Sequence, residues 1–230
     1  MSEPRTQRGG ATTTAIIGVG NIGGTVARHL VAGGESVVLA AQEESNAQAL
    51  AGELGQRARA ASVEDAIADG DAVVLAVWLD TLRELIPQQA GLLEGKVVVD
   101  PSNPIGFDES GQPFRTLPEG QSAGSVVAGL LPAGAHYVKA FGTLGAAALA
   151  AGAPRDSRRA VLFYATDDDT GATTIEGLIR AAGFDPLKAG GVADAGRIEV
   201  PGGDLFQQVG RNGHLLDLDQ ARARLRQVPV

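Results

Sequence analysis

The residues best suited to chemistry are three closely spaced glycines near the N-terminus. Their spacing matches the fingerprint of a dinucleotide-binding turn, in which the first glycine permits a tight turn. The second lets the backbone approach a pyrophosphate, and the third lets a helix pack close to the preceding strand. The N-terminus of that helix offers N–H groups and the positive end of its dipole to phosphates. The pattern therefore predicts a cofactor-binding turn for NAD(H) or NADP(H), made of Gly18, Val19, Gly20, Asn21, Ile22 and Gly23.

The segments that flank this turn have the composition that the fingerprint requires. Residues 15–17 form an apolar run that ends at Gly18, which is typical of a buried parallel strand. Apolar side chains then recur at helical spacing between residues 22 and 31, before Gly33 and Gly34 provide a helix stop. This order of strand, glycine turn and helix raises the motif above a chance match.

The choice between NAD(H) and NADP(H) is read about 20 residues beyond the turn, where an acid binds the ribose 2′-hydroxyl and Arg binds a 2′-phosphate. The chain has Ala41 and Gln42 there, followed by Glu43 and Glu44. Gln42 can hydrogen-bond either group, whereas the two acids would repel a phosphate unless they point away from it. The acids also fit the solvated start of a helix. The sequence thus leaves the choice of cofactor open.

The rest of the chain alternates between strand and helix patterns, which predicts an α/β fold with a Rossmann-type doubly wound parallel sheet. Further strands are expected at residues 37–40, 57–61, 72–77, 96–100, 136–141, 160–165 and 186–189. Further helices are expected around residues 47–54, after a Ser62 cap, around 82–86, and at 123–130, 170–182 and 217–227.

The length of 230 residues and the 44% hydrophobic content suit one well-buried core. We expect a flexible leader over residues 1–13 and a dinucleotide-binding Rossmann domain over residues 14–145. A short C-terminal α/β extension over residues 146–230 should pack on the same domain. Between residues 103 and 135 the Gly- and Pro-rich sequence predicts a long loop that holds only the short helix.

Composition disfavours several classes of protein. The 27 acidic and 19 basic residues give a formal net charge of −8, which would repel nucleic acid. No apolar run reaches the roughly 18 residues of a membrane span, and the lack of cysteine suits a reducing cytoplasm. The histidines are far apart, and the run Asp167-Asp168-Asp169 fits a solvated loop better than a divalent cation site. We expect a cytoplasmic protein without metal, nucleic-acid or membrane partners.

The glycine turn and three later segments resemble the NADPH-dependent coenzyme F-420 (deazaflavin) reductase family, whose relatives include the reductase domain of membrane metalloreductases. The likeness extends over residues 14–210. The later segments are residues 76–78 (AVW), 100–104 (DPSNP) and 138–145 (VKAFGTLG). The glycine turn is generic, and the last two segments are the more specific part of the resemblance.

The resemblance implies hydride transfer between NADP(H) or NAD(H) and a small-molecule ring acceptor, with coenzyme F-420, FMN or FAD as a diffusible co-substrate. It implies that residues 19–22 contact the pyrophosphate and that Ala41 and Gln42 lie at the ribose. The nicotinamide side would be lined by Ala76, Val77 and Trp78. The cleft for the second ring would be walled by Ser102, Asn103, Ala140, Phe141 and Thr143. Apart from the resemblance, the sequence fits two interpretations of Trp78 equally well: a residue of the hydrophobic core, or an exposed residue on which a ring stacks.

The sequence departs from the pattern of the family in two places. Ala41-Gln42 stands where the family typically has Ser-Arg to bind the 2′-phosphate, and Gly142 stands where it often has Asn before Thr143. The family resemblance also implies a homodimer. We expect its interface in a predominantly helical stretch over residues 204–216.

Hydride transfer between two rings needs little acid or base help, because both rings carry their own electronics. We therefore expect no catalytic side chain, only residues that position the rings and exclude water. A small carbonyl or imine reductase would instead need a proton donor, for which His136 and Lys139 are candidates. Ordinary strand-end side chains are the other interpretation of these residues. A dinucleotide-binding redox sensor without turnover is a third hypothesis.

Gly20→Val should abolish dinucleotide binding, because a branched side chain would occupy the path by which a pyrophosphate approaches the backbone. Fluorescence titration of the purified variant with NADPH and with NADH measures this effect. An affinity equal to that of the wild-type protein would show that the turn does not bind a dinucleotide.

Overall fold

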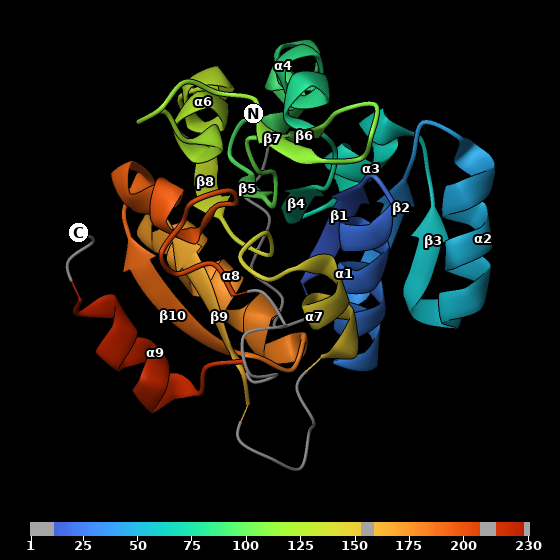
Figure 1. The fold of residues 1–230 in the computed structure, drawn as a ribbon. Coiled ribbons are helices and arrows are strands. Elements are labelled where there is room, and N and C mark those ends of the chain that lie inside the picture. The colour runs from blue at the N-terminus through green and yellow to red at the C-terminus, as the bar shows by residue number, and fades with distance from the viewer. Residues whose placement is uncertain (1–11, 153–158, 208–214, 228–230) are drawn as a thin grey trace.

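The computed structural model describes residues 12–152, 159–207 and 215–227, and its centre is one eight-stranded sheet (Figure 1). The order of the strands across the sheet is β10-β9-β8-β5-β4-β1-β2-β3. Residues 1–11 of the expected leader lie outside the described part, and Thr13 already belongs to the first strand, where it pairs with Ser36. The strands are β1 (Thr13–Ile17), β2 (Ser36–Ala40), β3 (Ala58–Ala60), β4 (Ala72–Leu75), β5 (Val97–Asp100), β8 (His136–Lys139), β9 (Val161–Ala165) and β10 (Asp185–Gly190).

The six strands from β8 to β3 run parallel and follow the strand order of the Rossmann fold. The order reverses between β1 and β4, and ligands bind at such a switch point, outside the carboxyl ends of the strands. β9 pairs antiparallel with β8, and β10 pairs parallel with β9, so the last two strands extend the same sheet. The predicted fold class is confirmed as a mostly parallel Rossmann-type sheet, whereas a domain boundary at residue 145 stays a prediction.

Helices cover both faces of the sheet, because successive side chains of a strand point to opposite faces. A core cluster around Ile16, Leu30 and Leu178 packs one face against α1 (Asn21–Ala32), α2 (Glu44–Leu54), α7 (Ala146–Ala151) and α8 (Asp169–Ala181). A second cluster around Ile17 and Leu82 packs the other face against α3 (Val63–Asp69), α4 (Leu79–Gln88), α5 (Ala90–Leu93) and α6 (Ala123–Leu130). A third cluster joins β9 to α9 (Leu218–Leu225) and to the 3₁₀-helix η2 (Val192–Ile198), and another 3₁₀-helix, η1 (Gly55–Arg57), precedes β3.

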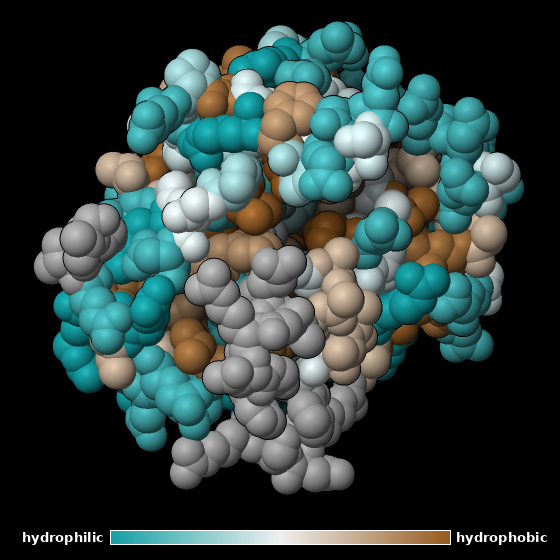
Figure 2. All heavy atoms as spheres, viewed as in Figure 1, coloured by the Kyte–Doolittle hydropathy of each residue, from teal (hydrophilic) through white to brown (hydrophobic). Residues whose placement is uncertain are grey.

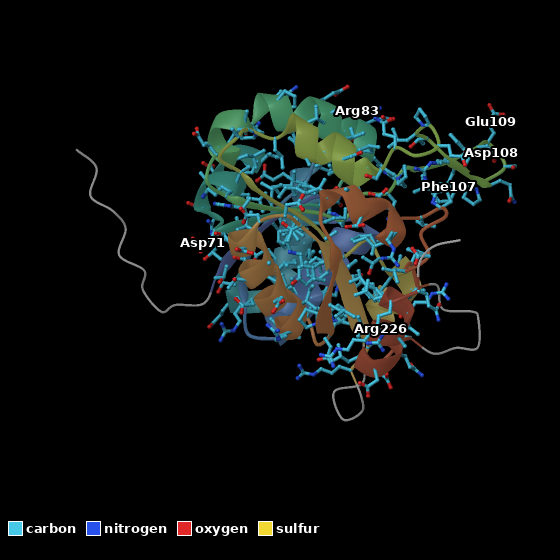
Figure 3. The ribbon with its side chains drawn as sticks, turned by 90° about the vertical axis from the view of Figure 1, so that its left-hand side faces the viewer. Asp71, Arg83, Phe107, Asp108, Glu109 and Arg226 are labelled. Carbon is cyan, nitrogen blue, oxygen red and sulfur yellow. The ribbon has the colours of Figure 1, made fainter. Side chains whose placement is uncertain are left out.

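The expected long loop at residues 103–135 is wrong in part, because it contains an antiparallel hairpin of β6 (Ile105–Phe107) and β7 (Pro113–Arg115). The Asp108 carboxylate closes the hairpin by accepting bonds from the backbone N–H groups of Ser110 at 2.9 Å and Gln112 at 2.8 Å. In Figure 3 the hairpin projects from the body of the protein, with Phe107, Asp108 and Glu109 at its outer end. Strands this short carry too little alternation to stand out in a sequence.

One further expectation is corrected, one is confirmed, and one helix was not expected. β8 ends at Lys139 rather than at residue 141, because Phe141 has a left-handed backbone with φ of 64°. The Ala-rich helix α7 was not expected, since its uniform composition gives no periodic pattern. The Ser62 cap is confirmed, as the hydroxyl accepts a bond from the N–H of Asp65 at 3.1 Å.

The predicted helix over residues 204–216 is wrong for its described residues, while residues 208–214 lie outside the described part. Residues 204–207 form a turn and an isolated bridge between Gln207 and Leu144. The Gln207 side chain donates to the carbonyl of Val161 at 3.0 Å and accepts from the N–H of Leu216 at 2.8 Å. These tertiary bonds replace helical ones, and a homodimer interface here stays a prediction. None of the helices in the described ranges is both long and apolar enough to cross a membrane.

Gly33→Ala should lower the free energy of unfolding by about 1–3 kcal/mol, which is the usual effect of overpacking. Gly33 ends α1 against α8, and a Cβ there would lie 2.0 Å from the carbonyl oxygen of Ala181. Urea unfolding of the purified variant measures the change. Gly52→Ala in α2 is the matched control, since a Cβ at Gly52 meets nothing within 4 Å. Equal stability of Gly33→Ala and the wild-type protein would contradict this close packing.

Candidate functional site

The candidate site is a cleft of about 1230 Å³ at the carboxyl ends of β1, β2, β4 and β5. Its volume exceeds the roughly 300–1,000 Å³ of pockets for a single drug-sized ligand, so the cleft has room for an extended dinucleotide and a neighbouring ring. Hydrophobic residues reach the surface in the middle of the face that Figure 2 shows, between hydrophilic side chains. The predicted residues on the cleft wall are Gly18, Val19, Gly20, Asn21, Ile22, Ala41, Gln42, Ala76, Val77, Trp78, Ser102 and Asn103.

The glycine turn has the geometry that its three glycines predict. Gly18 has φ of +92°, and a Cβ there would lie 2.4 Å from the carbonyl oxygen of Ala76. A Cβ at Gly23 would lie 1.9 Å from the carbonyl oxygen of Gly18, so α1 packs directly on the turn. A Cβ at Gly20 meets nothing within 4 Å. Gly18 and Gly23 are therefore required by the fold, whereas Gly20 faces open space where a ligand can approach.

The N-terminus of α1 lies at this turn without a side-chain cap. Its N-cap residue is Gly20, and its first turn contains no acidic residue. In contrast, the Ser122 hydroxyl caps α6 and the Asp168 carboxylate caps α8. Backbone N–H groups at an uncapped helix start need another partner, and a phosphate anion is favoured there by the helix dipole.

Gln42 and Glu43, exposed after the end of β2, line the cleft, as do Arg28 of α1 and Glu53 in the last turn of α2. Nε and Nη2 of Arg28 donate to the two carboxylate oxygens of Glu53, each at 2.8 Å. This bidentate bond from Arg28 holds the pKa of Glu53 below its usual value. Sequence reasoning did not find Arg28, because it lies outside the glycine motif; its position four residues after Gly24, on the same helix face, was the available signal.

Ala76, Val77 and Trp78 follow β4, on the other side of β1 from β2, and also line the cleft. Trp78 is 62% exposed and Phe107 of the hairpin is 55% exposed, so the core interpretation of Trp78 is wrong. The two rings meet edge to face, with their centroids 6.4 Å apart. The cleft thus has an exposed aromatic edge next to the nicotinamide end that the family resemblance implies.

Ser102 and Asn103 follow β5 and form a wall of the cleft. The buried Ser102 hydroxyl has no hydrogen-bond partner among the described residues, which marks it as a group that a ligand can satisfy. The Asn103 amide donates to the carbonyl of Gly142 at 3.0 Å and accepts from the N–H of Val200 at 2.9 Å. Asn103 therefore links the segment after β5 to the turn at Gly142 and to the segment at Val200.

The structure does not bring Ala140, Phe141 and Thr143 to the cleft surface, since all three are buried and none lines the cleft. Their turn supports the wall from behind, because a Cβ at Gly142 would lie only 2.2 Å from the carbonyl oxygen of Pro101. The residues that line the cleft after this turn are Leu144, Gly145 and Ala146. Gly23 is also buried beneath the turn, as its packing role requires.

A buried charge network lies behind the wall and was not predicted. Lys139 Nζ lies 3.0 Å from the Asp100 carboxylate and 3.4 Å from that of Glu199, and it also donates to the Ser102 carbonyl. Glu199 accepts bonds from the backbone N–H groups of residues 123 and 124, at the start of α6. Burial and the adjacent Asp100 carboxylate raise the pKa of Tyr137 well above its usual value.

The two candidate proton donors therefore have structural partners. Lys139 is 1% exposed and does not line the cleft. His136 starts β8, at the end of the sheet opposite the cleft, and its Nδ1 lies 2.8 Å from the Asp168 carboxylate. In the acidic run, Asp168 caps α8 and Asp167 accepts a bond from the N–H of Val192.

A Rossmann sheet with a glycine turn at its switch point and an uncapped helix start beside it defines the class of dinucleotide-binding proteins. Within this class, the sequence model of the family described as coenzyme F-420-dependent NADP oxidoreductase matches residues 13–104. Residues 13–104 of this chain thus match the family, in agreement with the resemblance seen in its motifs.

Three known proteins illustrate the similarity. Rat metalloreductase STEAP3 is 33% identical over 190 residues, which cover 83% of this chain and 36% of STEAP3, so the chain spans little more than a third of that relative. The crystal structure of a hypothetical protein from Sinorhizobium meliloti is 32% identical with a TM-score of 0.72, covering 90% of this chain and 95% of that chain. A crystal structure from Arthrobacter sp. FB24, described as an F-420-dependent NADP reductase, is 23% identical with a TM-score of 0.67, covering 80% and 87%. At this identity the last likeness shows the fold alone.

Lys139→Met should lower the free energy of unfolding by about 3–5 kcal/mol, because two buried carboxylates would lose their cation. Chemical denaturation measures the loss. Lys188→Met removes an exposed lysine of β10 and should change stability by less than about 0.5 kcal/mol. Unchanged stability of Lys139→Met together with loss of activity on a carbonyl substrate would favour a proton-donor role instead.

Proposed function

We propose that this protein transfers hydride between NADP(H), or NAD(H), and the ring of a deazaflavin (coenzyme F-420) or flavin acceptor. The observation that carries the proposal is the exposed edge of Trp78 and Phe107 at the end of the cleft away from Gln42. An exposed aromatic pair beside a dinucleotide-binding turn favours a second planar molecule stacked against the nicotinamide.

The reduced dinucleotide would supply the hydride, that is, two electrons and one proton, to the acceptor ring. The ring would take a further proton from water. The chain's own residues bind and orient the reactants. The turn at Gly18–Gly23 and the start of α1 would hold the pyrophosphate. Ser102, whose hydroxyl has no hydrogen-bond partner within the described part of the chain, would bind a polar group at the ring end.

Water exclusion is the remaining task of the cleft at its ring end. Leu79, Ile105, Leu144 and Phe206 contribute apolar surface there, along with Trp78. An apolar wall keeps the two rings at near-attack distance and protects the reduced ring from solvent. Lys139 and His136 are held in structural contacts and do not line the cleft, which argues against either of them as the proton donor of a carbonyl or imine reductase. A redox sensor without turnover remains as the second candidate, since dinucleotide binding alone would suffice for it.

The test is oxidation of NADPH and of NADH at 340 nm, with coenzyme F-420, FMN, FAD and a panel of small carbonyl compounds offered separately. We expect turnover with at least one ring acceptor and none with the carbonyl compounds. Turnover with carbonyl compounds only would contradict the proposal and favour the reductase. Tight NADPH binding without turnover of any acceptor would favour the sensor.

Trp78→Ala tests the aromatic edge in the same assay. Stacking on an aromatic side chain contributes enough that its loss should raise the KM for the ring acceptor about tenfold, with the KM for the dinucleotide little changed. Leu92→Ala is the matched control, because Leu92 is also an exposed apolar residue but does not line the cleft. An equal KM for the ring acceptor in Trp78→Ala and wild type would show that the ring binds elsewhere.

A further inference from the structure

Arg28 occupies a place in the cleft that the nucleotide-binding motif does not use. It lies on α1 two helical turns beyond Gly20. A Cβ built at Gly24 would lie 3.2 Å from Nη1 of Arg28, so the guanidinium is folded back over Gly24 toward the phosphate-binding turn. This direction is the usual one, because helical side chains lean toward the N-terminus of their helix. The absence of a side chain at Gly24 gives the guanidinium its space.

Arg28 lines the same cleft as the residues that follow β2. Arg28 lines the cleft together with Gln42, Glu43 and Asn46, which follow β2 or begin α2. In dinucleotide-binding folds the ribose 2′ substituent is recognised at the end of this strand. Of the described residues that line the cleft, Arg28 alone is basic.

The guanidinium can serve a second anion while it contacts Glu53. The bond to Glu53 uses the edge formed by Nε and Nη2, and the planar fork has further donors on Nη1 and Nη2. The side chains of Arg28 and Glu53 are 49% and 54% exposed, and ion pairs this exposed are weak. A phosphate therefore competes readily for Arg28, or binds its free edge.

We propose that Arg28 recognises the 2′-phosphate of NADP(H), and that Glu53 limits this preference by placing a carboxylate beside the same guanidinium. The inference rests on the proposed function, because it assigns a specificity residue to the same dinucleotide site. It gives a chain with Ala41-Gln42 in place of a basic residue after β2 another means of recognising the phosphorylated cofactor. The guanidinium fork suits a phosphate, which it binds through two parallel bonds.

The test compares the Kd values for NADPH and NADH by fluorescence titration of the full chain, without an acceptor. Loss of a charge-assisted bond should raise the Kd for NADPH at least about tenfold in Arg28→Gln and leave the Kd for NADH within about twofold. Removal of the competing carboxylate in Glu53→Gln should lower the Kd for NADPH about threefold and leave NADH unchanged. Both effects should shrink as the salt concentration rises, because the pair is exposed.

Arg59→Gln is the matched control. Arg59 pairs with Asp69, their side chains are 51% and 55% exposed, and Arg59 does not line the cleft. Its NADPH to NADH affinity ratio should equal that of the wild-type protein. Gln42→Arg is the positive control, since a guanidinium at the end of β2 should strengthen NADPH binding. Parallel losses of NADPH and NADH affinity in Arg28→Gln, or an unchanged ratio, would overturn the assignment.

Failure of this inference can be told apart from failure of the proposed function. The titration needs no acceptor, so the expected Kd pattern in a protein that turns over no ring acceptor would support Arg28 and contradict only the hydride transfer. Turnover of a ring acceptor with an unchanged Kd ratio would contradict only the role of Arg28. A wild-type protein that binds neither dinucleotide would overturn both.

Discussion

The close approach of α1 to the edge of β1 and β4 is the constraint on which the rest of the site depends. Gly18 and Gly23 have no Cβ, and each lies where a Cβ would collide with a backbone oxygen of the turn or of Ala76. Because α1 is seated this closely, its uncapped N-terminus opens into the cleft beside Gly20. The same seating places Gly24 and Arg28 on the side of α1 that faces α2, so one backbone contact positions both the uncapped helix start and the Arg28–Glu53 pair.

The far wall of the cleft depends on a different interaction, the buried charges behind β5 and β8. Lys139 joins Asp100, Glu199 and the Ser102 carbonyl, and Glu199 in turn binds the start of α6. Movement of any one of these groups would leave an uncompensated charge in the core. The arrangement of the network is therefore rigid. Asn103 adds a link from the wall to Gly142 and Val200. Residues near position 200 therefore help to shape a cleft whose motifs lie in the first half of the chain.

The two ends of the cleft differ in character, and this difference bears on the chemistry. Polar and charged side chains gather at the end of β2, whereas the end near Trp78 and the hairpin has the exposed aromatic side chains, together with Thr81 and Glu84 of α4. A dinucleotide has the same polarity, with phosphates and ribose along most of its length and a flat ring at one end. The proposed hydride transfer between rings would demand positioning and exclusion of water more than proton donors.

The sequence by itself determined the parts of this protein that depend on local pattern. The glycine turn, most strands and helices, the Ser62 cap and the Rossmann class follow from spacing and periodicity, because backbone geometry and burial impose them residue by residue. Short or uniform elements, such as the β6–β7 hairpin and α7, have too little pattern to be predicted. The expected helix at residue 204 is absent from the described residues 204–207, where the Gln207 side chain makes long-range bonds instead.

Only the tertiary structure decided that Lys139 is buried, that Trp78 is exposed, and that Arg28 reaches the cleft. These outcomes depend on partners far away in the chain, Glu199, Phe107 and Glu53, which no local pattern can specify.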